Sequence, residues 1–228
     1  MCGIIAAASN RNVGKLLVQG LHKMEYRGYD SAGIALHQTD HIAHLRTLGK
    51  VKLLEEKMIA EKPKSKLGIA HTRWATHGEP SEENAHPHMS NERVYIVHNG
   101  IIENYLDLKD FLKKEGYSFS SQTDSELIAH LLEYFLNKGN NMLDSMYLTK
   151  EKLDGAYAIA AIDKEDDQNI IIARSKSPLL IGIGMDEFLA ASDPLAIGQL
   201  TNEFIFLEDG DVAAVSYTHI RAHETMAH

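Results

Sequence analysis

The chain has 228 residues, of which 44% are hydrophobic and 24% are charged, as is typical of a globular protein with one sizeable core. Its 23 basic and 32 acidic residues give a net charge of −9, and no basic run stands out, which argues against a nucleic-acid partner. One cysteine allows no internal disulfide, and no apolar run approaches the ~20 residues that span a bilayer, so we expect a cytoplasmic protein without a membrane partner.

The first half of the chain mixes strand and helix patterns. Its long polar loop, Arg73–Ser90, exceeds what packing requires, and such loops are usually functional or disordered. Continuous or alternating apolar runs predict strands over Cys2–Ala8, Ser31–His37, His41–Leu48, Leu67–Thr72 and Val94–His98. Apolar residues at helical spacing predict helices over Val13–Glu25, Val51–Ile59 and Ile102–Glu115.

The second half begins with two helical stretches, Ser125–Asn137 and Met142–Leu153, and then changes to short strands. A short helix over Pro194–Leu200 interrupts these strands. The predicted strands are Ala156–Ile162, Ile170–Arg174, Leu179–Gly184, Glu187–Ala191, Asn202–Leu207 and Asp211–Val215. Closely spaced strands with grouped helices predict a single α+β domain of antiparallel sheets with helices outside, rather than a doubly wound parallel sheet.

Cys2 is the only cysteine, and it stands one position from the start of the chain. If Met1 is removed, Cys2 carries a thiol and a free α-amino group whose ordinary pKa is about 7.7–8.0. That amine can serve as general base for the neighbouring thiol, so that one residue supplies both nucleophile and base. A buried structural thiol and a chance position near the terminus remain alternatives.

A thiol that attacks an amide needs donors for the developing oxyanion, and Asn99-Gly100 could supply a side-chain amide and a backbone N–H. The alternative is a simple turn, because Asn-Gly is a common turn dipeptide. An amino-acid substrate would need a guanidinium for its carboxylate and a carboxylate for its ammonium, for which Arg73 and Asp124 are candidates. Asp124 could instead cap the helix that follows it. Trp74 in the long loop suggests a lid or a loop anchor.

Five of the thirteen histidines fall between positions 71 and 98. Their spacing matches neither a helical His-x3-His zinc motif nor a cysteine-assisted site, so we expect no metal there. We expect instead that these histidines hold the loop by hydrogen bonds. They are His71, His77, His86, His88 and His98.

Several motifs together resemble the glutaminase domains of the glutamine–fructose-6-phosphate aminotransferase (isomerising) family, within the class II glutamine amidotransferases that have an N-terminal cysteine nucleophile. The resemblance covers residues 1–215 and keeps the family order. The motifs are Met1–Ile4, Tyr26–Gly33, His71–Gly78, Asn84–His88, His98–Tyr105 and Thr123–Glu126. It implies a four-layer αββα sandwich of two antiparallel sheets, of the N-terminal nucleophile hydrolase type.

The resemblance also implies roles for individual residues. Cys2, freed of Met1, would attack the side-chain amide of L-glutamine, form a glutamyl thioester and release ammonia, with no cofactor and no metal. The remaining roles are an oxyanion hole at Asn99 and Gly100, carboxylate binding at Arg73, amine binding at Asp124, loop closure over glutamine at Thr76 and His77, ammonia gating at Trp74, and a cation beside the nucleophile at Arg27.

In the family, ammonia passes to a second half that binds fructose 6-phosphate, and we expect the full-length form to be a homo-oligomer. We expect residues 2–215 to form the glutaminase domain. Residues 216–228 do not resemble the family and resemble a translated sequencing adapter, so we expect a truncated fragment with an artefactual tail. The alternatives are an amidotransferase domain for another acceptor, such as a phosphoribosyl diphosphate, and a non-catalytic module that binds amino acids.

Overall fold

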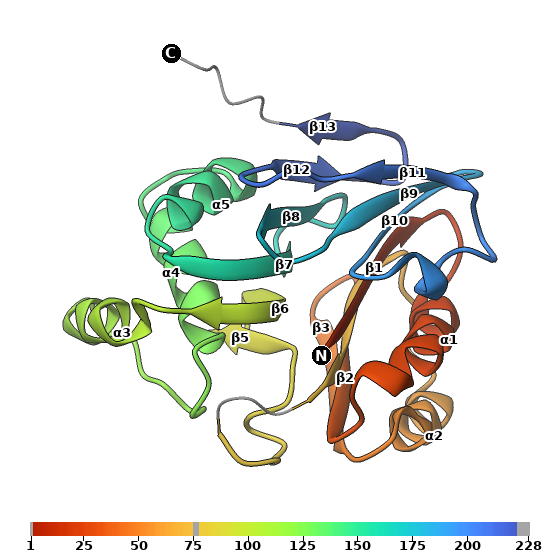
Figure 1. Ribbon diagram of the computed structural model, residues 1–228, viewed down its shortest axis with the longest axis horizontal. Helices are drawn as coiled ribbons and strands as arrows, with labels where there is room; N and C mark the ends of the chain where they lie inside the picture. The colour runs from red at the N-terminus through yellow and green to blue at the C-terminus, as the bar shows by residue number, and fades with distance from the viewer. Residues whose placement is uncertain (1, 75–77, 223–228) are drawn as a thin grey trace.

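The computed structural model describes residues 2–74 and 78–222, which form two antiparallel sheets stacked face to face between helices (Figure 1). Within these residues, the first sheet has seven strands in the order β11 (Glu203–Phe206), β9 (Leu180–Gly184), β10 (Glu187–Ala191), β1 (Gly3–Ser9), β4 (Leu67–Arg73), β2 (Ser31–His37) and β3 (Ile42–Leu48). The second sheet has six strands in the order β13 (Ile220–Ala222), β12 (Val212–Val215), β8 (Ile170–Ser175), β7 (Gly155–Asp163), β6 (Val94–Ile102) and β5 (His88–Ser90).

Helices cover the outer face of each sheet. Two of them, α1 (Gly14–Met24) and α2 (Val51–Glu61), lie on the first sheet. The second sheet is covered by α4 (Glu126–Leu136) and α5 (Met142–Lys150), and α3 (Tyr105–Lys114) packs against α4. Figure 1 shows the resulting order of helix, sheet, sheet and helix. The predicted αββα sandwich is therefore confirmed.

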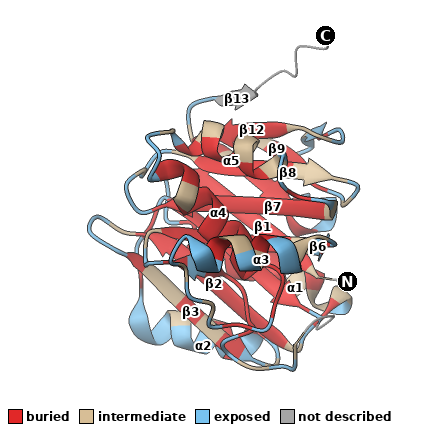
Figure 2. Ribbon diagram, turned by 90° about the vertical axis from the view of Figure 1, so that its left-hand side faces the viewer, coloured by how far each residue is buried: buried red, intermediate tan, exposed pale blue. Residues whose placement is uncertain are grey.

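Period-two alternation assigns each strand residue to one layer of the core. Ile4, Ala6 and Ala8 of β1 join the core between the sheets, whereas Ile5 and Ala7 face α1. Because both faces are covered, every residue of β1 is buried (Figure 2). The continuous apolar runs in the sequence follow from this double coverage.

The structure corrects several predicted boundaries. β6 continues through Asn99-Gly100 to Ile102, where a strand end was expected, and α3 begins only at Tyr105. β5 lies inside the segment expected to be a loop. The expected helix at Pro194–Leu200 is reduced to one 3-10 turn, Pro194–Ala196. Within the expected tail, Ala222 of β13 pairs with β12. None of the described helices is long and apolar enough to cross a bilayer.

Candidate functional site

Cys2 directly precedes β1, at one end of the sandwich, and its thiol faces the residue that follows β4. The backbone N–H of Trp74 donates to Sγ at 3.3 Å, and Sγ lies 3.5 Å from the carbonyl oxygen of Trp74. A small cavity of about 20 Å³ opens here. It is lined by Cys2, Arg73, Trp74, His86, His98, Gly100, Thr123, Asp124 and Ser125.

The surroundings of Cys2 keep its thiol protonated. Burial raises the pKa of the Cys2 thiol above its ordinary value, and the Trp74 N–H and the positive charge of Arg73 oppose that rise only in part. Asp30 adds to the rise. Because the thiolate is the nucleophilic form, chemistry at this thiol near neutral pH requires a base to remove its proton.

Two opposite charges meet in the same cavity. Arg73, the last residue of β4, is buried, and its Nη2 donates to the carbonyl oxygen of Gly78 at 3.4 Å. Asp124 is also buried, and its Oδ2 accepts the backbone N–H of Ile102 at 2.8 Å. The N-cap of α4 is Ser125, so capping does not account for the Asp124 carboxylate. One guanidinium and one carboxylate in a common cavity suit the two charged groups of an amino acid.

Asn99 and Gly100 lie in paired strand, not in a turn. Asn99 pairs with Ala158 of β7, and its Nδ2 donates to the carbonyl oxygen of Cys2 at 3.2 Å. Gly100 has φ +135°, and a Cβ there would stand 1.8 Å from the carbonyl oxygen of Ala156. Only glycine fits this backbone, and it leaves the cavity wall open beside Cys2. The turn interpretation of Asn-Gly is therefore wrong.

Trp74 and Arg27 stand at the rim of the site. Trp74 is 51% exposed, and its ring meets Tyr29 edge-on at 6.0 Å. Gly28 lies so close to Trp74 that a Cβ would come within 2.9 Å of it. Arg27 Nη1 donates to Asp193 at 3.2 Å, so its charge is compensated by a carboxylate. The arginine whose charge lowers the pKa of the Cys2 thiol is Arg73. Thr76 and His77, like Met1, lie outside the described residues.

Histidines form a buried group behind the cavity, and two of them line it. Nδ1 of His98 lies 2.9 Å from Oγ of Ser125, and Nε2 of His88 lies 3.0 Å from Oγ1 of Thr123. His86 stacks on His71 with ring centroids 4.1 Å apart. Sequence reasoning gave His86 and His98 no place in the cavity, although His98 directly precedes the Asn99-Gly100 motif. Within the described residues, no group of three or more His, Cys, Asp or Glu side chains could hold a metal ion.

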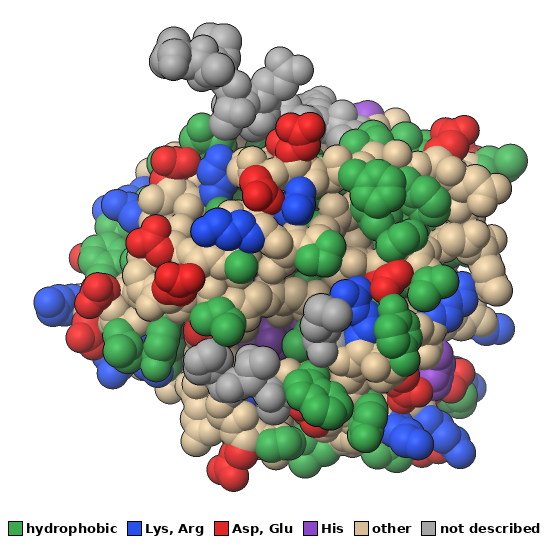
Figure 3. Space-filling view, viewed as in Figure 1, with side chains coloured by type: hydrophobic (Ala, Val, Ile, Leu, Met, Phe, Trp, Pro, Cys, Tyr) green, Lys and Arg blue, Asp and Glu red, His purple; other side chains and the backbone are tan. Residues whose placement is uncertain are grey.

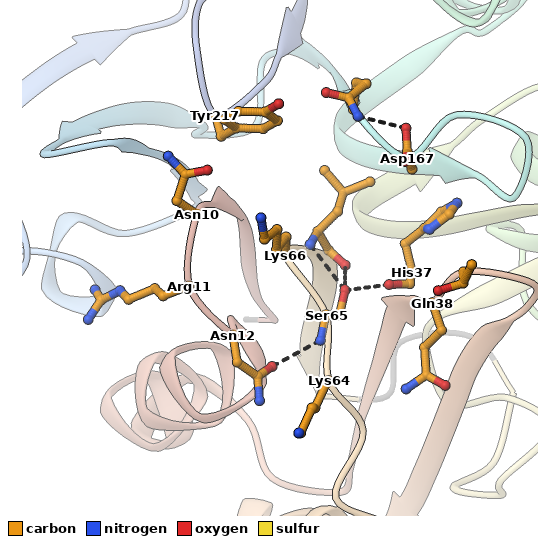
Figure 4. Close-up of a pocket in the computed structure, with 13 residues that line it drawn as sticks. Asn10, Arg11, Asn12, His37, Gln38, Lys64, Ser65, Lys66, Asp167 and Tyr217 are labelled. Atoms are coloured by element: carbon orange, nitrogen blue, oxygen red, sulfur yellow. Dashed lines mark hydrogen bonds between the residues drawn. The ribbon is translucent and has the colours of Figure 1, made fainter.

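A larger cavity, of about 580 Å³, lies at the opposite end of β1 (Figure 4). Its polar groups bond one another: Asn12 Oδ1 accepts the Ser65 N–H at 3.1 Å, and Ser65 Oγ donates to the His37 carbonyl at 2.6 Å. It is lined by Asn10, Arg11, Asn12, His37, Gln38, Thr39, Lys64, Ser65, Lys66, Leu67, Asp167, Gln168 and Tyr217. None of the residues that line it is a cysteine, whereas the smaller cavity is lined by Cys2.

Comparison with known families identifies the domain. The family model described as glutamine amidotransferase domain matches residues 71–199, more than half of the chain. The chain belongs to the glutamine amidotransferase domain family. This confirms the family resemblance of the sequence motifs and agrees with a cavity that joins a thiol, a guanidinium and a carboxylate.

Relatives of this amidotransferase domain include the glutamine–fructose-6-phosphate aminotransferase (isomerizing) of Haemophilus ducreyi. It is 51% identical over 217 residues, or 95% of this chain and 35% of that protein. The enzyme of the same name from Vibrio cholerae is 47% identical over 227 residues, or 99% of this chain and 37% of that protein. The chain thus spans about a third of the length of these curated relatives.

Solved structures share the fold of the amidotransferase domain. The glutamine phosphoribosylpyrophosphate amidotransferase of Bacillus subtilis superposes with a TM-score of 0.85 at 24% identity, covering 99% of this chain and 50% of that one. A glutamine aminotransferase class-II domain protein of Silicibacter pomeroyi superposes with a TM-score of 0.65 at 12% identity, covering 98% and 99%. These likenesses confirm the predicted fold.

Proposed function

We propose that this domain hydrolyses the side-chain amide of glutamine to glutamate and ammonia, with Cys2 as nucleophile. The observation that carries the proposal is the shared cavity, in which the Cys2 thiol, the Arg73 guanidinium and the Asp124 carboxylate come together. Arg73 binds the α-carboxylate of glutamine, and Asp124 binds its α-ammonium. This arrangement fixes both ends of an amino acid while its side chain reaches the thiol.

The base in this mechanism is the α-amino group of Cys2 itself, which is available once Met1 has been removed. Because burial raises the pKa of the thiol, this amine takes the thiol proton as Sγ attacks the amide carbon. The tetrahedral oxyanion accepts hydrogen bonds from the Gly100 N–H and from Asn99 Nδ2.

Return of the proton to the amide nitrogen releases ammonia and leaves a glutamyl thioester on Cys2. Water, deprotonated by the same amine, attacks the thioester and releases glutamate, which restores the thiol. The family pattern adds Thr76 and His77 as closing residues over glutamine and Trp74 as a gate for ammonia. The first two lie outside the described residues.

The identities of 47–51% to the isomerizing aminotransferases support a role in supplying ammonia for glucosamine 6-phosphate synthesis, a step of hexosamine formation in the cytoplasm. Fructose 6-phosphate would bind to a second part of the complete enzyme, which we expect to be a homo-oligomer. Another acceptor is less well supported, since the likeness to the phosphoribosylpyrophosphate enzyme is 24% identity. We keep residues 2–215 as the proposed domain and 216–228 as a tail foreign to the family.

Glutamate release tests this function. Protein that begins at Cys2 is incubated with glutamine, beside Cys2→Ala, and glutamate and ammonia are both measured. We expect equimolar glutamate and ammonia from the first protein. Loss of the nucleophile lowers kcat by roughly 10³-fold or more. Equal turnover in Cys2→Ala would overturn the assignment of the nucleophile, and no turnover in the intact protein would favour a module that only binds amino acids.

A further inference from the structure

His71 lies behind the proposed oxyanion hole and belongs to β4. It is 1% exposed and shares a strand face with Leu67 and Ile69, whose side chains fill the core between the sheets. The same alternation directs His71 from the first sheet toward β6 of the second. Its ring therefore reaches the backbone of His98 and the side chain of Asn99.

The contacts of the His71 ring define its tautomer. Nε2 lies 3.1 Å from the carbonyl oxygen of His98 and 3.0 Å from Oδ1 of Asn99. A backbone carbonyl can only accept a hydrogen bond, so Nε2 must carry a proton. Burial lowers the pKa of His71 to about 3, which keeps the imidazole neutral and leaves Nδ1 without a proton. His71 is thus a neutral Nε2–H donor.

This tautomer decides which way the Asn99 amide points. Because Nε2–H donates, the Asn99 atom that faces it must be the oxygen. The amide nitrogen then faces the carbonyl oxygen of Cys2 at 3.2 Å, which likewise can only accept. Two backbone carbonyls on opposite sides therefore enforce one orientation. Of the two protons on Nδ2, one is bound to the Cys2 carbonyl and the second remains for the substrate.

We propose that His71 is a positioning residue that holds the Asn99 amide with its NH₂ toward Cys2, so that the oxyanion meets a donor and not an oxygen. If the amide were flipped, Oδ1 would face both the Cys2 carbonyl and the oxyanion. Repulsion between oxygens would then replace the hydrogen bond from Nδ2. The stacked ring of His86 restrains the plane of His71. This inference rests on the proposed glutaminase function.

Kinetics separate positioning from simple packing. His71→Leu keeps the size but removes the donor, whereas His71→Gln keeps an N–H near the position of Nε2. We expect kcat to fall about 10–100-fold in His71→Leu, with KM for glutamine changed less than about 2-fold, because complete loss of one oxyanion donor costs about 10²–10³-fold. His71→Gln should stay within a few-fold of the parent protein.

A double-mutant cycle with Asn99→Ala provides the decisive control. If His71 acts through Asn99, His71→Leu lowers kcat by less than about 2-fold when Asn99 is already alanine. A full, multiplicative loss in that background would overturn the proposal. Urea unfolding of each variant verifies the fold. Should His71→Leu fail to fold, His71→Asn replaces it, because its shorter amide does not reach the Nε2 position.

A second measurement does not depend on turnover. Long-range ¹H–¹⁵N correlation spectra of histidine-labelled protein report which imidazole nitrogen carries the proton. We expect a neutral Nε2–H tautomer for His71 from pH 6 to pH 8, and a Nδ1–H or doubly protonated ring would overturn the inference. If the parent protein shows this tautomer but hydrolyses no glutamine, the proposed function fails while the arrangement of His71 and Asn99 stands.

Discussion

Buried clusters of histidine and hydroxyl side chains lie both at the cavity beside Cys2, where His98 contacts Ser125, and away from it. In the second cluster, Oγ of Ser90 lies 2.7 Å from Nδ1 of His130 and donates to Oε2 of Glu133 at 2.5 Å. Serine, histidine and glutamate are the residue types of a hydrolase triad. All three are at most 5% exposed, and none lines the cavity at Cys2.

The difference between the clusters lies in what their polar atoms point at. The Ser90 hydroxyl is directed at a carboxylate and ties β5 to α4, so it stabilises packing between a strand and a helix. At Cys2, by contrast, the thiol and Gly100 line a cavity that also holds a guanidinium and a carboxylate, and the Asn99 amide donates to the carbonyl oxygen of Cys2. Figure 3 shows acidic, basic and hydrophobic side chains interspersed over one face of the molecule. Surface charge of this kind does not mark the site, whereas access of reactive groups to a cavity does.

The largest predicted effect is a loss of folding stability at acid pH, caused by the buried histidines near Cys2. Burial lowers the pKa of His71 to about 3 and the pKa of His88 to about 3, against about 6.5 in the unfolded chain. Between these values the unfolded state binds more protons, so the free energy of unfolding falls as the pH drops below 6.5. At pH 5 each histidine costs about 2 kcal/mol relative to pH 7.5, or about 4 kcal/mol together.

Urea unfolding at pH 7.5 and pH 5.0 measures this loss of stability. His88→Gln, which removes one titrating group, should reduce the difference between the two pH values by about 2 kcal/mol. A free energy of unfolding that is unchanged or higher at pH 5.0 would contradict the account of neutral buried histidines.

Arg73→Ala should weaken glutamine binding, whereas the same substitution of an arginine outside the cavity should not. Loss of a buried guanidinium that binds a carboxylate costs about 2–3 kcal/mol, so we expect KM to rise about 30–160-fold. Arg93, which pairs with Asp163 and Glu165 away from the cavity, supplies the matched control. Arg93→Ala should leave KM within 2-fold. The same KM in both variants would remove Arg73 from the binding site.

Ser90→Ala should produce the smallest effect, and on stability rather than turnover. Glu133 then loses one buried donor and keeps the Asn91 amide at 2.7 Å, so we expect a loss of about 1–2 kcal/mol in the free energy of unfolding. The values of kcat and KM for glutamine should change less than 2-fold in the folded protein. A large fall in kcat without a loss of stability would show that the second cluster takes part in catalysis.

Sequence periodicity predicted most of the fold because each layer of the sandwich imposes a repeat of 2 or 3.6 on its residues. It failed at Asn99-Gly100, where a turn dipeptide continues β6 because Gly100 alone tolerates the contact with Ala156. It also failed at β5, since three residues are too few to show alternation.

The candidate site was predictable where a residue's chemistry is rare or its position distinctive, as for Cys2, Arg73 and Asp124. The contact between His71 and Asn99 was not predictable from the sequence. Alternation along β4 assigns its side chain to a face of the first sheet, but only the packing of the two sheets brings Asn99 opposite. The same holds for His98, whose place in the cavity depends on how β6 meets α4.

The central claim is that Cys2 acts with its own free α-amine, and one protein can test it before and after a single cleavage. The chain is made with a protease-removable extension that ends directly before Cys2, and glutamate release is measured on both forms, with Cys2→Ala as control. We predict no hydrolysis above the control before cleavage and full glutaminase activity after it. Equal turnover in the extended and cleaved forms would contradict the account.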